Sequence, residues 1–341
     1  MKRRLSIILV PTALLMAIGI AAFGVWLHSE LETPYYGARA PEEFIDIPKG
    51  ATANEIADIL TQSGILKRRI PFLIYLRYAD MGRQIRAGEY KFHAPETPKG
   101  IARRLVRGDV YFRSITIPEG FTARETIELL AENGLGSIAE MERALLRTDW
   151  IQDLDSKAKN LEGYLFPETY HFGRKTDSET IVKTMVEQFR RQISKLLKES
   201  PPKAGWNISR IVILASIIEK EVMRSEERPL VASVLINRLK RGIPLACDAT
   251  IIYAMKLAGT YKGNLSKADL QMKSPYNSYL HPDLPPGPIA NPGADSLRAA
   301  LNPADTDYLY YVSRNDGTHQ FSKNWRDHTK AVNKYQRPKG R

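Results

Sequence analysis

The chain has 341 residues, of which 43% are apolar and 26% are charged, and its formal net charge is +12. This length allows two or three domains with a sizeable core, and the composition is typical of a globular protein. The single cysteine, Cys247, excludes an intrachain disulfide and a multi-cysteine metal site, and no two of the six histidines have the i, i+4 spacing of HExxH sites. We therefore expect no metal or other cofactor.

The N-terminus carries an uncharged apolar segment, residues 5–27, preceded by Lys2, Arg3 and Arg4. Such a helix spans about 34 Å, enough to cross a bilayer core of roughly 30 Å. A cleaved signal peptide is the alternative, but its apolar region usually has only about 7–15 residues. We predict a cytoplasmic tail at 1–4, a transmembrane helix at 5–27, and the remainder of the chain outside the inner membrane, because the basic end stays in the cytoplasm.

The positive net charge suits an anionic polymer or anionic lipid headgroups, although a solvated basic surface without a partner explains it equally well. Nucleic acid is not expected outside the cytoplasm, and the sequence has no lysine/arginine tract or interleaved aromatic platform that would bind it.

Residues 28–44 contain two prolines and no apolar period, so we predict a spacer that lifts the next domain off the membrane. An internal repeat follows. Residues 45–66 align with 115–136 at an offset of 70, with nine of 22 positions identical. Each copy predicts a short strand and then a helix. Thr52 and Glu55 form the capping box that starts the helix in the first copy, and Thr122 and Glu125 form it in the second.

Between the two copies the sequence predicts a helix at 70–81, a strand at 87–92 and a helix at 98–107. The order β-α-α-β resembles a LysM-type module, a small fold that grips polymers containing N-acetylglucosamine. A scaffolding α+β unit without a ligand is an equally good interpretation. We place this module at 45–110 and a larger domain at 111–335.

The second half begins with an aromatic-rich segment at 161–172 and contains a proline-rich stretch at 273–304, which predicts an ordered loop. A hairpin turns at Asp316-Gly317. The predicted helices of this half are 178–199, about 207–224, about 228–241 and a last one that carries His328 to Tyr335.

The stretch ILASIIEKEV, residues 213–222, places Glu219 and Glu221 at the end of an apolar run. A carboxyl held against apolar side chains has a raised pKa, as a general acid requires. Helical periodicity does not choose between the two glutamates. The alternative is a surface ion pair of either glutamate with one of the nearby basic residues Lys220, Arg224 or Arg228.

Six blocks occur in order: LEGYLFPETY (161–170), ASIIEKE (215–221), VLINRL (234–239), SPYNSY (274–279), LPPGPIANPG (284–293) and DGTHQFSKNWRDH (316–328). In content and spacing they resemble the endolytic murein transglycosylases, the MltG/YceG-like family. The resemblance implies cleavage of peptidoglycan glycan strands between N-acetylmuramic acid and N-acetylglucosamine, with the C6 hydroxyl of the sugar as nucleophile and a 1,6-anhydro product. It maps the catalytic glutamate onto Glu219.

Five other residues fall in or near these blocks and are candidate substrate-binding residues, because amide and carboxylate groups can bind sugar hydroxyls and tyrosine rings can stack on pyranose faces. A structural role is as good an interpretation of each. They are Asn237, Asp248, Tyr276, Asn277 and Tyr279.

Taken together, the sequence predicts an α+β protein with a transmembrane helix, a LysM-like module and a mixed α+β catalytic domain that terminates or trims nascent glycan strands. Its expected partners are the glycan strands, the membrane and peptidoglycan synthases. One alternative is a non-catalytic, membrane-anchored scaffold. The other is a pyridoxal phosphate lyase using Lys220, against which the export signal and the lack of a phosphate-binding glycine loop argue.

Overall fold

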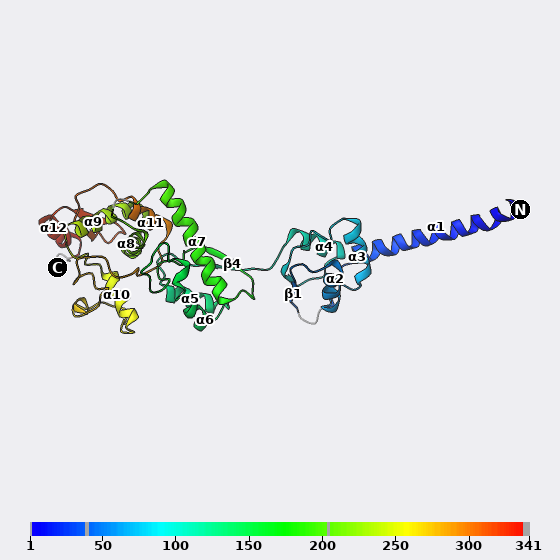
Figure 1. Cartoon of the computed structure of the whole chain (residues 1–341), viewed down its shortest axis with the longest axis horizontal. Helices are drawn as coiled ribbons and strands as arrows, with labels where there is room; N and C mark the ends of the chain where they lie inside the picture. The colour runs from blue at the N-terminus through cyan, green and yellow to red at the C-terminus, as the bar shows by residue number, and fades with distance from the viewer. Residues whose placement is uncertain (1, 38–40, 203–204, 337–341) are drawn as a thin grey trace. The chain divides into compact units, whose positions relative to one another are not determined.

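The chain folds into two compact units, Met1–Arg113 (unit 1) and Ser114–Arg341 (unit 2) (Figure 1). The computed structural model describes residues 2–37, 41–202 and 205–336. The predicted boundary between 110 and 111 lies close to the division between the two units. Both units mix helices with short two-stranded sheets.

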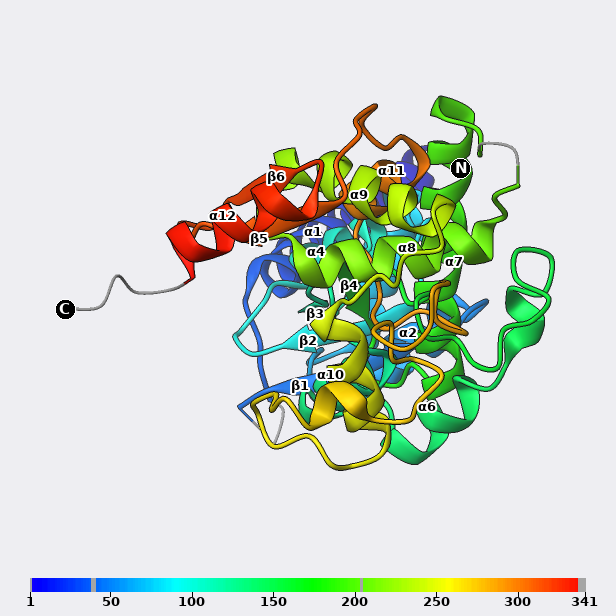
Figure 2. The same ribbon diagram turned by 90° about the vertical axis from the view of Figure 1, so that its left-hand side faces the viewer.

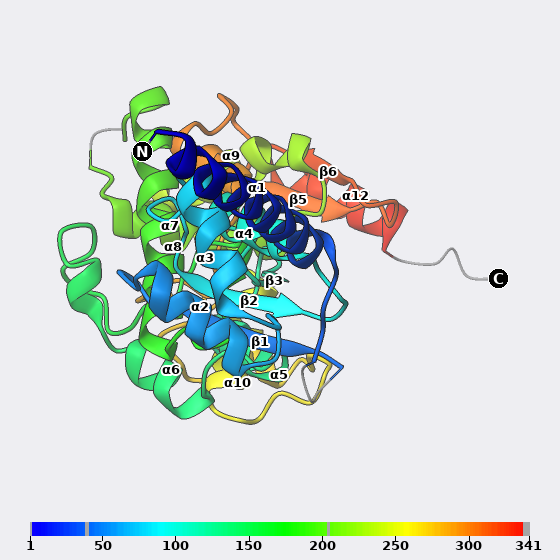
Figure 3. The same cartoon turned by 90° about the vertical axis from the view of Figure 1, so that its right-hand side faces the viewer.

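Unit 1 starts with a long helix, α1 (Lys2–Glu32). From Thr12 to Glu32 this helix is long and apolar enough to cross a membrane, with a mean hydropathy of 1.7. Its last turn packs on α3 (Arg69–Tyr78) and α4 (Pro98–Arg107) (Figure 3). Leu31 is buried there, and the carboxylate of Glu32 pairs with Lys99 of α4.

The predicted spacer at 28–44 is wrong for its first part, because α1 continues to Glu32 and the chain then follows the surface of unit 1. The backbone of Tyr35 bonds to that of Glu96 (N···O 3.1 Å), and the Gly37 N–H donates to the carbonyl of Gly64 (2.8 Å). These contacts between distant segments have no periodic sequence signal. Residues 38–40 lie outside the described residues.

The order predicted for the rest of unit 1 is confirmed: β1 (Glu43–Ile47), α2 (Ala53–Gln62), α3, β2 (Gly88–Phe92) and α4. β1 and β2 pair in antiparallel register, with Ile45 opposite Tyr90. Alternate residues of both strands point into the core, where they meet one face of each helix. The largest buried side chains of this core are Tyr90, Phe72, Phe92, Ile47, Ile56, Leu60 and Leu76.

The two predicted capping boxes are present. Thr52 and Glu55 exchange hydrogen bonds at the start of α2, as do Thr122 and Glu125 at the start of α5 (Ala123–Glu132). The two copies of the repeat nevertheless belong to different units. In the second copy, β3 (Arg113–Thr116) pairs with β4 (Thr169–Phe172) rather than with a strand of unit 1. The shared local sequence therefore specifies a strand followed by a helix, but it does not specify which other strand pairs with that strand.

Unit 2 is built around α8 (Ile208–Glu221), in which every residue from Ile211 to Ile218 is buried. A helix that is apolar on all sides must be surrounded, and α9 (Arg228–Lys240), α10 (Asp248–Leu257) and α11 (Ala294–Leu301) all contact α8 (Figure 2). The remaining α-helices and strands are α6 (Ile138–Ala144), α7 (Ser178–Glu199), the antiparallel hairpin of β5 (Tyr310–Ser313) and β6 (His319–Ser322), and α12 (Trp325–Tyr335). Short 3-10 helices lie between them, at Thr148–Trp150, Ser225–Glu227 and Asp269–Gln271.

The predicted loop at 273–304 is wrong in its last part, because α11 occupies residues 294–301. The helix has only eight residues, and its N-cap residue Gly293 offers no capping side chain, so neither length nor a cap marks it in the sequence. The hairpin turn predicted at Asp316-Gly317 is confirmed, since this pair lies between β5 and β6.

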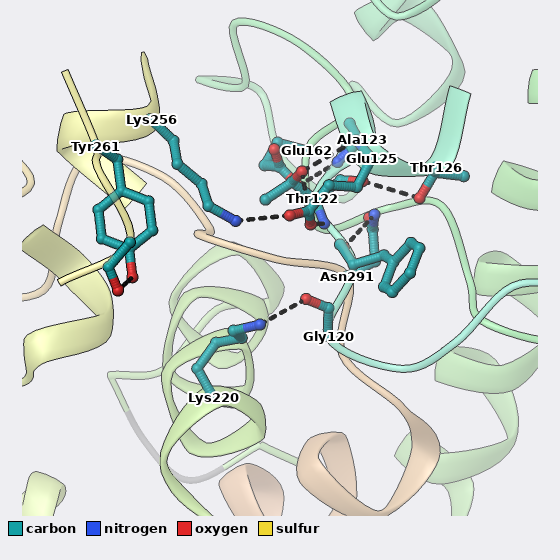
Figure 4. Close-up of polar contacts among 12 residues, drawn as sticks. Gly120, Thr122, Ala123, Glu125, Thr126, Glu162, Lys220, Lys256, Tyr261 and Asn291 are labelled. Atoms are coloured by element: carbon teal, nitrogen blue, oxygen red, sulfur yellow. Dashed lines mark hydrogen bonds and ion pairs between the residues drawn. The ribbon is translucent and has the colours of Figure 1, made fainter. Parts of the chain in front are cut away.

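A fully buried amide, that of Asn291, joins three distant segments of unit 2 (Figure 4). Its Oδ1 accepts hydrogen bonds from the backbone N–H groups of Gly163 (2.9 Å) and Leu165 (3.0 Å), and its Nδ2 donates to the carbonyl of Phe121 (2.9 Å). Its backbone carbonyl accepts from the Gly120 N–H (3.0 Å). Because these groups are buried, the amide satisfies donors that water cannot reach.

We expect Asn291→Ala to lower the free energy of unfolding of unit 2 by about 2–5 kcal/mol, because two buried N–H groups lose their acceptor. Urea unfolding of the full chain in detergent, followed by tryptophan fluorescence, measures this loss. The matched control is the exposed Asn264→Ala, which should change the value by less than about 0.5 kcal/mol. A loss below about 1 kcal/mol for Asn291→Ala would contradict the role of this amide.

Candidate active site

Glu219 lies in the last turn of α8, where the ends of three helices meet. Its Oε1 accepts a hydrogen bond from Nη2 of Arg228, the first residue of α9 (2.9 Å). Its Oε2 accepts from the N–H of Gly293, directly before α11 (2.9 Å). Only 5% of the Glu219 side chain is exposed. The carboxyl is thus held by one charged and one backbone donor.

This environment differs from the apolar wall predicted for the carboxyl of Glu219, and that prediction is wrong. The ion pair with Arg228, which was the alternative interpretation, is present, but it is buried: the Arg228 side chain is 7% exposed. The helical pattern of α8 could not show that this ion pair is buried, because Arg228 belongs to α9, which follows the connecting segment 222–227.

A second carboxyl, that of Glu119, reaches the same guanidinium nitrogen. Its Oε2 lies 3.4 Å from Nη2 of Arg228. A Cβ atom on Gly293 would collide with the Glu119 carboxylate, so this carboxylate lies directly over that glycine. Glu119 belongs to a turn in which Gly120 has a φ of +76° and its carbonyl accepts from Lys220 Nζ (3.1 Å) (Figure 4).

Acidic groups outnumber basic groups around Arg228. Besides Glu119 and Glu219, the Oδ2 of Asp295 lies 4.0 Å from its Nη1. Burial raises the pKa of Glu119, the negative charge of Glu219 raises it further, and the guanidinium of Arg228 opposes both effects. Burial and these neighbours together therefore favour the protonated form of Glu119, compared with an exposed carboxyl.

The other candidate, Glu221, faces different elements. Its Oε2 accepts from the hydroxyl of Tyr311 in β5 (2.9 Å). Burial raises the pKa of Glu221, and the charge of Asp248 at the start of α10 adds to that rise. The two glutamates of the E-K-E triplet thus point to two separate neighbourhoods, one at α9 and α11 and the other at α10 and β5.

Two of the predicted substrate-binding residues lie beside Glu221. The Tyr279 hydroxyl donates to Oδ1 of Asp248 (2.7 Å), and Asp248 is the first residue of α10. Tyr276 is half-buried and packs its ring against Tyr253, with centroids 5.0 Å apart.

The two predicted asparagines, Asn237 and Asn277, donate hydrogen bonds to backbone carbonyls. Asn277 is fully buried, and its Nδ2 donates to the carbonyls of Leu270 and Met272. Asn237 donates to the carbonyls of Thr306 and Tyr308 (2.7 and 3.0 Å) and lines a cavity of about 640 Å³ that Glu219 does not line. Within the described part of the chain, no hydrogen bond joins any of the five candidates to Glu219.

Figure 4 shows a further carboxyl, that of Glu162 in the LEGYLFPETY block, near α5. It is buried and accepts from the Ala123 N–H (2.9 Å) and the Tyr253 hydroxyl (3.2 Å). Burial raises its pKa to about 7. Both contacts link α5 to α10 from inside, so this carboxyl supports the fold. No group of three side chains suited to a metal occurs among the described residues.

Sequence reasoning did not assign Glu119, Gly293 or Asp295 to the site, and it considered Arg228 only as a surface partner. One signal was present in the repeat: Pro-Lys-Gly in the first copy becomes Pro-Glu-Gly in the second, with Glu119 at the position of Lys49. Two otherwise similar turns differ there by two units of charge, and the acidic turn lies beside Glu219.

The sequence model of the YceG-like family matches residues 45–334. An endolytic murein transglycosylase of Bacillus subtilis (strain 168) is 34% identical over 307 residues, which cover 85% of this chain and 84% of its own. One from Streptococcus pneumoniae serotype 2 is 28% identical over 84% of this chain and 57% of its own. The 2.6 Å crystal structure of a yceG-like protein from Listeria monocytogenes has a TM-score of 0.57 and 28% identity, over 85% of this chain and 98% of the other. The chain therefore belongs to the YceG-like family.

Proposed function

We propose that the protein is a peptidoglycan lytic transglycosylase that cuts glycan strands internally, between N-acetylmuramic acid and N-acetylglucosamine. Family membership and the names of the relatives support this activity. The observation that carries it is the carboxyl of Glu219, held between the Arg228 guanidinium and the Gly293 N–H where three helix ends meet.

The reaction exchanges one bond for another. The bond from C1 of muramic acid to the leaving oxygen breaks, and a bond from C1 to the C6 oxygen of the same sugar forms, which gives a 1,6-anhydro end. The leaving oxygen gains a proton and the C6 hydroxyl loses one, so no water is consumed. Ordinary glycosidases need two carboxyls for these roles. Here one carboxyl, that of Glu219, can in the simplest case exchange the proton in both directions.

Arg228 and the Gly293 N–H hold the Glu219 carboxylate in one orientation, which suits its role as the base for the C6 hydroxyl. Attack within one sugar is effectively intramolecular. Good alignment of such a step lowers the barrier by several kcal/mol, and by about 7–11 kcal/mol in ideal geometry. We further propose that the strands cut in this way are nascent ones, whose growth the enzyme terminates or trims.

We expect Glu219→Gln to lower the rate of anhydro-end formation at least 100-fold, because the amide cannot exchange the proton. The matched control is Glu221→Gln on the same helix, which should keep the rate within about threefold, since an amide can still accept from Tyr311. Mass spectrometry of sugar ends after digestion separates anhydro from reducing ends. A folded Glu219→Gln protein with full activity would refute the proposed function, and wall binding without any product in the unaltered chain would favour the scaffold alternative.

We also propose that α1 anchors the protein in the inner membrane with the basic residues of its first turn in the cytoplasm. Length and composition support this. Protease added to spheroplasts should degrade unit 2 and the part of unit 1 that follows α1, and leave only a fragment the size of α1. The chain should stay with the membranes after a carbonate wash, and its release into the soluble fraction would contradict an anchor.

We propose, third, that unit 1 binds glycan as LysM modules do. The β-α-α-β order supports this, as does a cavity of about 480 Å³ at the turn before α2, which Asp58 and Gln62 help to line. Both residues are replaced by Ala in a chain that also carries Glu219→Gln. The dissociation constant for glycan strands, measured by co-sedimentation, should rise about tenfold if each side chain makes one hydrogen bond. The matched control replaces Glu128 and Glu132, their counterparts in the second copy. Equal losses in both proteins would contradict a glycan site in unit 1.

A further inference from the structure

The two carboxyls that share the Arg228 guanidinium are not equivalent. Glu219 is 5% exposed and has a donor on each of its oxygens, whereas the Glu119 side chain is 48% exposed at the outer edge of the same cluster. Both approach one nitrogen, Nη2, at 2.9 and 3.4 Å, so their oxygens cannot lie farther apart than the sum of these distances. A group that arrives from solvent therefore reaches the exposed Glu119 carboxyl before the buried Glu219 carboxyl.

We propose that Glu119 is the second proton-exchanging carboxyl of this site and works with Glu219 as a pair. The inference rests on the proposed transglycosylase function and divides its proton transfers between two residues. Glu119 carries the proton in the resting protein, and Glu219 is the carboxylate that Arg228 and Gly293 hold in place.

The charges around Glu119 favour this division. Glu219 and Asp295 are acidic neighbours, Arg228 is the basic one, and the Lys220 ammonium is bonded to the carbonyl of Gly120, the next residue. Burial and the charge of Glu219 raise the pKa of Glu119. Like charges so close disfavour a state in which both carboxyls are ionised, which favours the protonated form of Glu119.

The proton balance closes over one turnover. As the bond from C1 to the leaving oxygen breaks, Glu119 gives its proton to that oxygen. As the C6 oxygen bonds to C1, its hydroxyl proton passes to Glu219. The pair then holds one proton as before, now on the inner carboxyl, and its return to Glu119 restores the resting state. No oxidant, metal or water enters the balance.

Glu119→Gln in the full-length chain tests the pair, with Asp295→Asn as the matched control. The two native side chains are equally exposed (48% each), and each substitution replaces a carboxyl near Arg228 by an amide. We expect Glu119→Gln to lower kcat/KM for anhydro-end formation at least 100-fold. It should also remove the fall in rate that deprotonation of Glu119 causes at rising pH. Asp295→Asn should lower kcat/KM by less than a tenth of the factor found for Glu119→Gln. The kcat/KM of Glu119→Asp should be at least tenfold higher than that of Glu119→Gln.

Gly293→Ala provides a second test that leaves Glu119 itself in the chain. The backbone at Gly293 has a φ of −75°, which alanine adopts freely, and the N–H to Glu219 remains. The added Cβ displaces the Glu119 carboxylate, so the rate should fall at least tenfold.

The outcomes separate this inference from the proposed function. Activity within threefold of the unaltered chain in Glu119→Gln or Gly293→Ala, with Glu219→Gln inactive, would overturn the pair and leave the function standing. A large loss in Glu119→Gln with an unchanged pH profile and no recovery in Glu119→Asp would show a packing role and also overturn the pair. Full activity of Glu219→Gln would remove the function itself.

Discussion

The buried amide of Asn291 fixes the geometry on which the site depends. It holds Phe121 on one side and Gly163 and Leu165 on the other, and its own carbonyl bonds to Gly120. The turn that presents Glu119 and the segment that leads to Gly293 therefore meet at one side chain. Since backbone groups in this interior have no water to bond to, any displacement of the amide leaves them unsatisfied. The part of the site that lies on loops, Glu119 and the segment before Gly293, is therefore tied to the buried interior of unit 2 through this amide.

The apolar run of α8 and its acidic end have one common explanation. The helix is surrounded from Ile211 to Ile218, and only its last turn reaches the edge of the core. There Glu219 meets Arg228, and Glu221 meets Tyr311. A buried ion pair contributes little net stability, because desolvation offsets the attraction, but it fixes where both groups lie. In this protein that fixed position brings the carboxyl, the guanidinium and a backbone N–H together.

Local patterns in the sequence predicted most elements well, and contacts between distant segments were the part they could not predict. The capping boxes at Thr52 and Thr122 and the helix at 178–199 depend on neighbouring residues, so the sequence contains their whole cause. The docking of residues 33–37, the short helix α11 and the burial of Arg228 depend on tertiary packing. For the same reason Glu219 could be named as a candidate from sequence and resemblance, while its partner Glu119, 100 residues away, could not.

The last turn of α1 docks against α3 and α4, with Leu31 buried and Glu32 paired to Lys99. This docking joins the proposed anchor to the rest of unit 1 without a flexible linker. One residue inserted in a continuous helix rotates everything beyond it by about 100° and advances it by about 1.5 Å. With α1 as the proposed anchor, the number of residues in α1 would set both the rotation of the rest of unit 1 about the bilayer normal and its height above the membrane. The proposed anchor would therefore orient the rest of unit 1 as well as hold it at the membrane.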